Sequence, residues 1–159
     1  ATYAACNSDM DLNPAACEEL RGIGTMDIDT LTATGLITRG FVRFDLDSKL
    51  AGKTIDTVTL RLTTTNEFDS RSRNSGEISV VTPFSATTLP KAQPTRLGAP
   101  VGMDLGQVVD GTNYFWGLPK YLVAADAPVF LGIDTMSSNG AYYWNDHGPI
   151  PPLLIVAYH

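Results

Sequence analysis

Apolar and polar residues alternate along several short stretches of the chain. Residues 40–46 and 57–63 show the pattern most clearly. Every second side chain in them is apolar: Val42, Phe44, Leu46, Val58, Leu60 and Leu62. This period of two is typical of β-strands that bury one face and leave the other nearer solvent. The turn between the two stretches, Ala51-Gly52-Lys53, is too short for a crossover helix, so we expect these strands to pair antiparallel.

Further stretches of this kind are separated by clusters of Gly, Pro, Asn and Ser. They cover residues 25–30, 37–46, 54–65, 77–81, 114–122, 128–134, 141–145 and 153–158. The proline-containing residues 83–100 show little periodicity and are expected to cross the surface. Eight or nine short strands with turn signals between them predict an all-β fold. We expect one domain over residues 1–159, an antiparallel β-sandwich of jelly-roll type.

The first 24 residues lack the strand pattern and are predicted to be an irregular lead-in. One short helical turn is expected from Pro14, which suits a first helical position, with Asn13 as its cap. Cys6 and Cys17 allow two interpretations. In an oxidising compartment they would close a loop worth about 3 kcal/mol, whereas in the cytosol they are two small side chains. We expect the disulfide, and with it an extracellular or cell-surface location.

Composition and charge limit the classes of partner that this chain is expected to bind. The chain has 159 residues, of which 43% are hydrophobic and 18% charged, and its formal net charge is -6. A negative surface repels nucleic-acid phosphate, so no nucleic acid is expected to bind. No stretch is long and apolar enough to span a bilayer, and we expect no membrane insertion. The chain starts at Ala1 without an apolar leader, as it would after signal-peptide removal or in a piece of a larger secreted protein.

Three segments together resemble a known family. They are residues 39–46 (RGFVRFDL), 52–62 (GKTIDTVTLRL) and the closing 151–158 (PPLLIVAY). The chain resembles the DNRLRE-type, disaggregatase-related extracellular β-sandwich domains of bacteria and archaea, which are grouped with carbohydrate-binding modules. The resemblance covers roughly residues 25–158. It implies a non-catalytic binding or scaffolding domain, attached to or secreted with a larger system.

The residues themselves offer no recognisable reaction. The chain lacks a GxSxG elbow, an HExxH helix and a P-loop, and it holds only two histidines, His147 and His159. We therefore predict that the protein is not an enzyme.

Calcium is the one cofactor that the sequence suggests. Asp9, Asp11 and Asn13 place oxygen-bearing side chains at alternate positions of a polar loop, and calcium accepts such loops. A second acidic cluster would form if Asp27, Asp29 and Asp45 met on an outer sheet face. On that face Arg43 and Arg61 would offer cross-strand ion pairs instead.

Aromatic residues are the usual platforms for sugars, because the C–H face of a pyranose stacks on an aromatic ring. Tyr142 and Trp144 alternate onto one face of a predicted strand that leads into a polar loop. We predict a ligand-binding edge made of Trp144, Tyr142, Asn145, Asp146 and His147, with Trp116 as a further aromatic.

The leading function is therefore a carbohydrate-binding module that holds a polysaccharide by aromatic stacking and polar contacts. The alternative is a structural or adhesive extracellular domain, in a stalk or surface assembly, whose partners are proteins or neighbouring domains.

Overall fold

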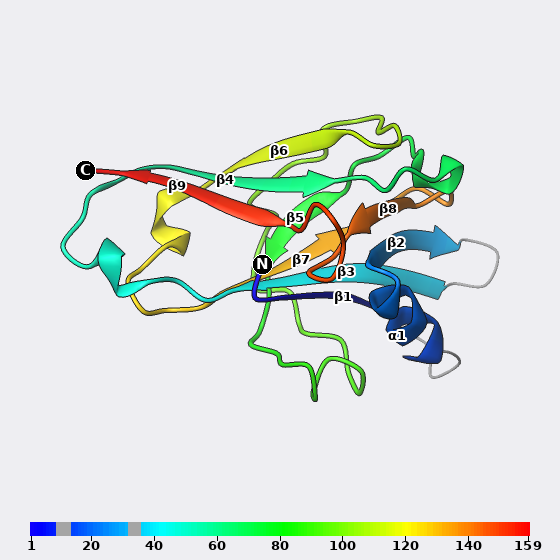
Figure 1. Ribbon diagram of the computed structural model, residues 1–159, viewed down its shortest axis with the longest axis horizontal. Coiled ribbons are helices and arrows are strands. Elements are labelled where there is room, and N and C mark those ends of the chain that lie inside the picture. Colours follow the sequence, from blue (N-terminus) through cyan, green and yellow to red (C-terminus); the bar gives the residue numbers. More distant parts are fainter. Residues whose placement is uncertain (9–13, 32–35) are drawn as a thin grey trace.

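A computed structural model describes residues 1–8, 14–31 and 36–159, and in this part of the chain nine strands form two antiparallel sheets (Figure 1). The strands are β1 (Tyr3–Ser8), β2 (Thr25–Leu31), β3 (Leu36–Phe44), β4 (Ile55–Thr63), β5 (Glu77–Val80), β6 (Asn113–Leu118), β7 (Val129–Asp134), β8 (Ala141–Trp144) and β9 (Leu153–Tyr158). One α-helix, α1 (Pro14–Gly22), and three short 3-10 turns complete the described elements. The predicted all-β sandwich is confirmed.

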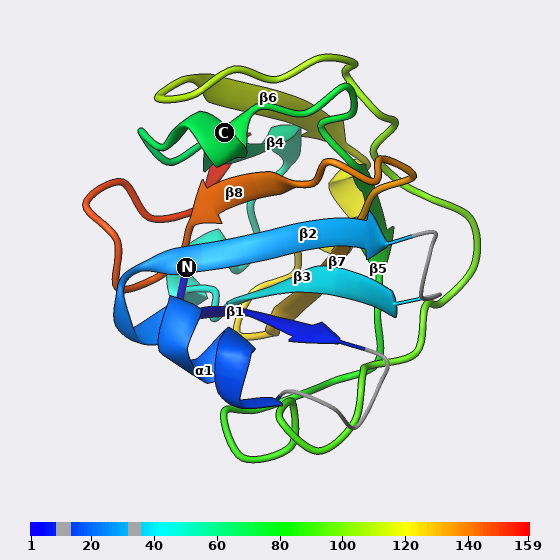
Figure 2. The same cartoon turned by 90° about the vertical axis from the view of Figure 1, so that its right-hand side faces the viewer.

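The two sheets differ in size. The larger has the order β5-β7-β3-β2-β8, with β1 also paired to β3, and the smaller has the order β6-β4-β9. Figure 2 shows the sheets from one end, with β6 and β4 above and the strands of the larger sheet below. Each sheet therefore has an inner face toward the other sheet and an outer face away from it.

The inner faces meet in one apolar core. It is built from the alternate residues that the sequence pattern marked, among them Val42 of β3 and Leu60 of β4, both fully buried. Trp116 and Tyr143 come from opposite sheets and contact edge to face, with ring centroids 6.3 Å apart. Aromatic pairs prefer this geometry, and they contribute packing beyond their buried area.

The expected pairing between residues 40–46 and 57–63 is wrong. These stretches are β3 and β4, which lie in different sheets: β3 pairs with β1, β2 and β7, and β4 pairs with β6 and β9. The connection includes residues 45–54 and a 3-10 turn at Ser48–Leu50, which is long enough to pass from one layer to the other. Arg43 and Arg61 consequently project from opposite outer faces.

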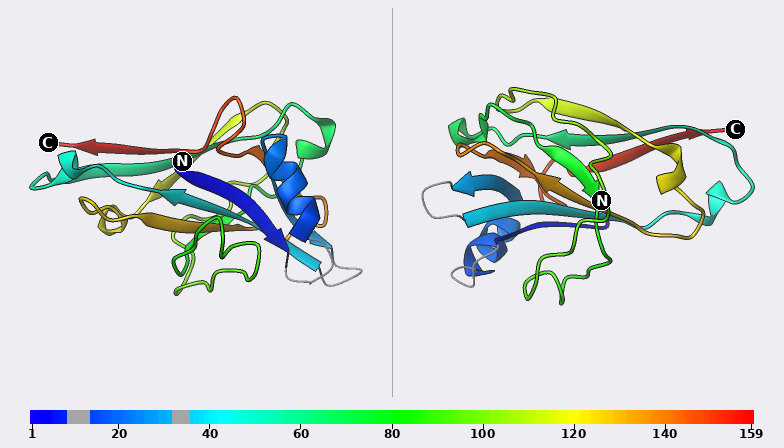
Figure 3. Two further views of the ribbon diagram at one scale, coloured as in Figure 1. Left: turned by 60° about the horizontal axis from the view of Figure 1, so that its bottom comes forward. Right: turned by 180° about the vertical axis from the view of Figure 1, so that it is seen from behind.

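The outer face of the larger sheet has a small core of its own. The connection over residues 82–100 passes over this face, outside the sandwich in both views of Figure 3. Its Phe84 and Leu89 pack on Phe41, Ala5 and Val81, and all five side chains are buried. The proline-containing stretch is thus a cover for the sheet as well as a surface connection.

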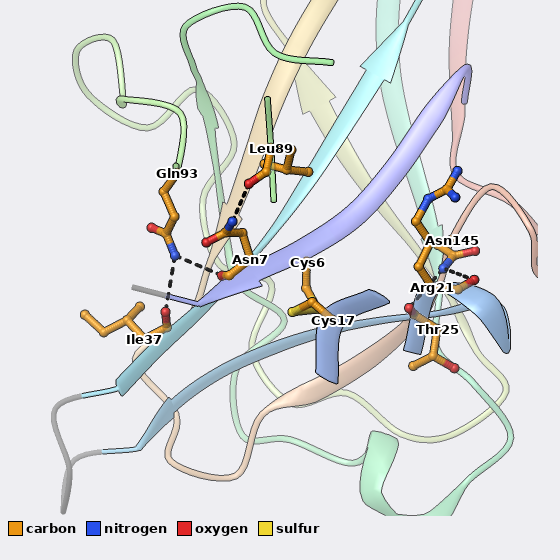
Figure 4. The surroundings of a disulfide bond; sticks show 9 residues. All are labelled: Cys6, Asn7, Cys17, Arg21, Thr25, Ile37, Leu89, Gln93 and Asn145. Atoms are coloured by element: carbon orange, nitrogen blue, oxygen red, sulfur yellow. Dashed lines mark hydrogen bonds between the residues drawn. A yellow bond between two sulfur atoms is a disulfide. The ribbon is translucent and has the colours of Figure 1, made fainter. Parts of the chain in front are cut away.

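The N-terminal segment is more regular than predicted. Residues 3–8 form β1, which pairs along β3 from Tyr3 opposite Arg43 to Ser8 opposite Thr38. The helix begins at Pro14, as expected, and continues to Gly22. Cys6 of β1 and Cys17 of α1 form the predicted disulfide, with their Cα atoms 5.4 Å apart (Figure 4). Within the described residues, no helix is long and apolar enough to cross a membrane.

Replacing both cysteines by serine should lower the free energy of unfolding by about 2–4 kcal/mol, because the cross-link restricts the unfolded chain. Urea denaturation of the double variant measures this loss. A reducing agent should shift the wild-type midpoint to that of the variant and leave the variant unchanged. An unaltered midpoint for the variant would contradict a stabilising role for the bond.

Candidate functional site

Tyr142 and Trp144 lie on the outer face of β8, as their alternation predicts, and both are half-buried. Tyr142 stands directly opposite Asp27 in the pairing of β8 with β2, and Trp144 stands opposite Thr25. Gly148 packs closely against the Trp144 ring. A Cβ atom added at Gly148 would lie only 2.9 Å from a carbon of that ring. The structure therefore brings two predicted aromatics together, with one ring partly covered by the following loop.

The polar residues of the predicted edge are mostly engaged inside the fold. Asn145 is fully buried, and its side chain donates hydrogen bonds to the carbonyls of Arg21 and Thr25, at 3.2 and 2.9 Å. Asp146 accepts from the Ala4 N–H at 2.9 Å and forms an ion pair of 2.8 Å with Arg21. These two side chains join the end of β8 to α1, β1 and β2. Figure 4 shows the bonds of Asn145 to Arg21 and Thr25. His147 remains exposed, so it alone of the three polar residues is open to solvent.

Trp116 does not belong to a binding edge. It is 1% exposed and its ring packs against Tyr143 in the core. The alternation along β6 turns Trp116 inward and leaves Phe115 on the outer face, 51% exposed. The aromatic cluster at residues 114–118 is thus divided between the core and the surface.

Asp27 and Asp29 lie two residues apart on β2, and both are partly buried. The pKa of Asp27 is raised from its ordinary value of 3.8 to about 7. Burial is the largest cause and the nearby carboxylate of Asp29 adds to it, whereas a hydrogen bond from the Ile28 backbone acts in the opposite direction. Burial also raises the pKa of Asp29. One carboxylate oxygen of each residue is buried without a hydrogen-bond partner among the described residues.

The two metal predictions have different outcomes. Asp45 does not join Asp27 and Asp29, because it lies beyond the end of β3 and pairs with Arg43 at 2.7 Å. Among the residues that the structure describes, no three acidic, histidine or cysteine side chains could hold a metal ion together. Asp9, Asp11 and Asn13 lie outside the described residues, so calcium at that loop stays a prediction.

A cavity of about 630 Å³ lies on the outer face of the larger sheet. Its lining comes from β3, β7, the end of β2 and the 82–100 connection. The polar members are Thr30, Arg39, Gln93, Thr95, Arg96, Asp134 and Thr135, and the apolar members include Ile37, Phe41, Val81, Pro94 and Met136. We call this cavity the outer pocket. Its volume falls within the range of small-ligand sites.

Two arginines share one carboxylate in the outer pocket. Arg39 donates from Nε to Oδ1 of Asp134, and Arg96 donates from a terminal nitrogen to Oδ2. The described lining of the pocket therefore carries two positive charges and one negative charge, although the whole chain is negative. The Arg96 side chain is 40% exposed, so part of its guanidinium faces the solvent-filled space.

The wall of the outer pocket is attached firmly to the sheet. Gln93 donates to the carbonyls of Asn7 and Ile37, at 2.9 and 3.3 Å (Figure 4). It also accepts a bond from Arg39. Asn7 in turn donates to the Leu89 carbonyl. These bonds position the connection over β1 and β3, so the pocket is largely formed in advance of any ligand.

The sequence holds little signal for the outer pocket. Its charged members, Arg39, Arg96 and Asp134, are far apart in the chain and each resembles an ordinary surface charge. A weak indication is the alternation along β3, which places Arg39 on the same face as Phe41. The antiparallel register of β3 with β7, which sets Gly40 opposite Ile133, brings Asp134 close to Arg39.

Comparison with known proteins gives no assignment. No family model matches the chain, and no curated protein sequence matches it. The resemblance to DNRLRE-type domains stays a prediction from the residues that carry it.

Substitution of Asp27 by asparagine tests the acidic pair. Because the folded pKa is raised, the stability linked to this group is full below pH 4 and is lost as the pH rises through about 7. At pH 8.5 the neutral variant should be more stable than the wild type by about 1–4 kcal/mol, and near pH 4 the two should be similar.

Urea denaturation at both pH values measures the difference. Asp126→Asn, in an exposed turn, is the matched control and should leave the pH dependence unchanged. The raised pKa would be refuted if Asp27→Asn kept the wild-type dependence on pH.

Proposed function

We propose that this domain binds a carbohydrate, without catalysis, in the outer pocket. The observation that carries the proposal is the lining of that pocket, where planar charged and amide groups surround an apolar floor. Sugars present hydroxyl pairs at fixed spacing beside apolar C–H faces. Planar side chains such as those of arginine, aspartate and glutamine can form bidentate hydrogen bonds with two adjacent hydroxyls, while apolar groups pack against the sugar ring.

The hydrogen bonds of Asp134 support a pocket that binds a sugar and does not cleave a glycosidic bond. Glycoside hydrolysis by the usual route needs two carboxyl groups that flank the bond and exchange protons. Among the described residues that line the outer pocket, Asp134 is the one carboxylate, and both of its oxygens already accept bonds from arginine. Such a group is suited to orient donors and to accept a hydroxyl, and it is poorly suited to transfer a proton.

Tyr142, Trp144 and the exposed His147 form a second contact region for a long glycan, on the outer face at β8. It lies beyond the pocket lining on the same sheet, which is compatible with a polymer that extends past one sugar-sized cavity. The disulfide supports an extracytoplasmic location, where polysaccharides are encountered and such bonds persist.

One observation favours the alternative, a structural or adhesive role with protein partners. The outer face of the smaller sheet exposes apolar side chains: Phe115, Leu153 and Ile155 are each more than 40% exposed. Apolar surface of this kind is common at protein contacts. The two roles are compatible, because this face and the outer pocket lie on opposite sheets.

Arg96→Ala should weaken glycan binding about tenfold or more, since it removes donors worth about 1.5–3 kcal/mol from the pocket. Affinity electrophoresis against a panel of neutral and acidic polysaccharides identifies a ligand, and isothermal titration then measures the loss. Arg43→Ala, on the outer face of β3 outside the pocket lining, is the matched control and should bind as the wild type does.

Trp144→Ala tests whether the glycan contacts the β8 edge as well as the outer pocket. A moderate loss of glycan affinity in Trp144→Ala would mean that the glycan contacts both the outer pocket and the β8 edge. A complete loss of affinity in Trp144→Ala, with normal binding by Arg96→Ala, would mean that the site lies at the β8 edge instead. The proposal fails if no glycan of the panel is retarded by the wild-type protein.

We also propose calcium at Asp9, Asp11 and Asn13. Saturating calcium should raise the midpoint of thermal unfolding by mass action, and a chelator should reverse the shift. The Asp9→Asn/Asp11→Asn variant should not respond to calcium. An identical wild-type midpoint in calcium and in chelator would rule out a bound ion that stabilises the fold.

A further inference from the structure

Strand β9 lies at one end of the smaller sheet and pairs with β4 alone among the described residues. The backbone groups of successive residues in a strand point alternately to its two sides. His159 and Thr54 exchange backbone hydrogen bonds of 3.1 and 3.0 Å, so the odd-numbered residues of β9 point their backbone groups toward β4. Those of Leu154 and Val156 point to the open side.

The side of β9 that faces away from β4, here called the open side, has no partner strand among the described residues from Leu153 onward. Just before it, the Pro152 carbonyl accepts a hydrogen bond of 2.6 Å from the amino group of Ala1. The backbone groups of Leu154 and Val156 have no comparable bond to another described element. An unpaired row of this kind is a template for another strand, since pairing satisfies each N–H and C=O.

Natural edge strands usually carry features that prevent pairing, such as lysine, proline, bulges or a covering loop. The segment 153–158, LLIVAY, contains no charge and no proline, and the bulge of this ladder lies on β4 between Ile55 and Thr57. Leu153 and Ile155 are each 42% exposed on the outer face. Both the backbone and the side chains of β9 are thus suited to an additional strand.

We propose that two copies of this chain pair through β9, antiparallel, around a two-fold axis at Ile155. This register sets Leu154 of each copy opposite Val156 of the other, so that the residues with open backbone groups exchange both hydrogen bonds. It joins the two smaller sheets into one continuous sheet. A closed pair of this type uses the same surface twice and leaves no further β9 edge.

Side-chain matching favours a second copy as the partner. On the outer face, Ile155 meets Ile155 of the other copy, and Leu153 meets Ala157. Directly opposed side chains in an antiparallel pair lie about 4.5–5.5 Å apart and stabilise the pair when both are apolar. Because β9 is uncharged, the symmetric arrangement brings no like charges together.

The position of Ile155 on the axis gives a sharp test. Ile155→Lys and Ile155→Glu each place two like charges opposite each other in the pair, so each variant alone should be monomeric. A mixture of the two should form a heterodimer, because the lysine of one copy then faces the glutamate of the other. Light scattering after size-exclusion chromatography measures the mass of wild type, variants and mixture.

Phe115→Lys is the matched control, since Phe115 lies on the same outer face at the opposite edge strand, β6. It should remain dimeric if pairing occurs through β9. Far-ultraviolet circular dichroism and thermal unfolding verify that each variant is folded. A second variant, Val156→Pro, removes an N–H on the open side without removing a bond to β4, and it should also abolish the dimer.

Three results would overturn the proposal. A monomeric wild type at all accessible concentrations excludes the pair. Open-ended oligomers indicate unlike surfaces in contact instead of a two-fold axis. Dissociation by Phe115→Lys together with failure of the lysine–glutamate mixture would show that the flat face, and not the β9 edge, forms the contact.

Discussion

The packing of two sheets around Trp116 and Tyr143 determines where every other feature of the molecule can lie. With a period of two, each strand that turns an apolar residue into this core turns the next residue outward. The core therefore fixes the composition of both outer faces. On the larger sheet it directs Arg39, Phe41 and Asp134 outward, and on the smaller sheet Phe115 and Ile155. The surfaces proposed to bind partners follow from the same alternation that fills the core.

The alternation predicted the strands well and their partners poorly. It identified both faces of β3 and β4, yet these consecutive strands belong to different sheets. Periodicity describes which face is buried, and a sandwich buries a face equally well whether the next strand pairs beside it or packs across from it. The residues of β1, Tyr-Ala-Ala-Cys-Asn-Ser, show no regular alternation of apolar and polar side chains, and their strand structure depends on pairing with β3.

In the candidate site, too, features that depend on local alternation were predicted, and features that depend on distant residues were not. Tyr142 and Trp144 were predicted to share an outer face and do so, because only local alternation is needed. The roles of Asn145 and Asp146 depend on Arg21, Thr25 and Ala4, which are distant in the chain. The outer pocket was not predicted, because it exists only once residues 82–100 cover the sheet and Gln93 is bonded to β1 and β3.

The two outer faces are suited to different tasks. The connection over residues 82–100 packs on the larger sheet's outer face and leaves a charged cavity. The smaller sheet exposes Phe115, Leu153 and Ile155 on its outer face and, within the described residues, is open at β9. A pair joined through β9 would keep both pockets uncovered, since each lies on the opposite sheet of its own copy. If the proposed glycan binds, two modest sites on one polymer would act together, because the second binding event would be intramolecular and its effective concentration high. A long repetitive glycan is the class of ligand that gains most from this arrangement.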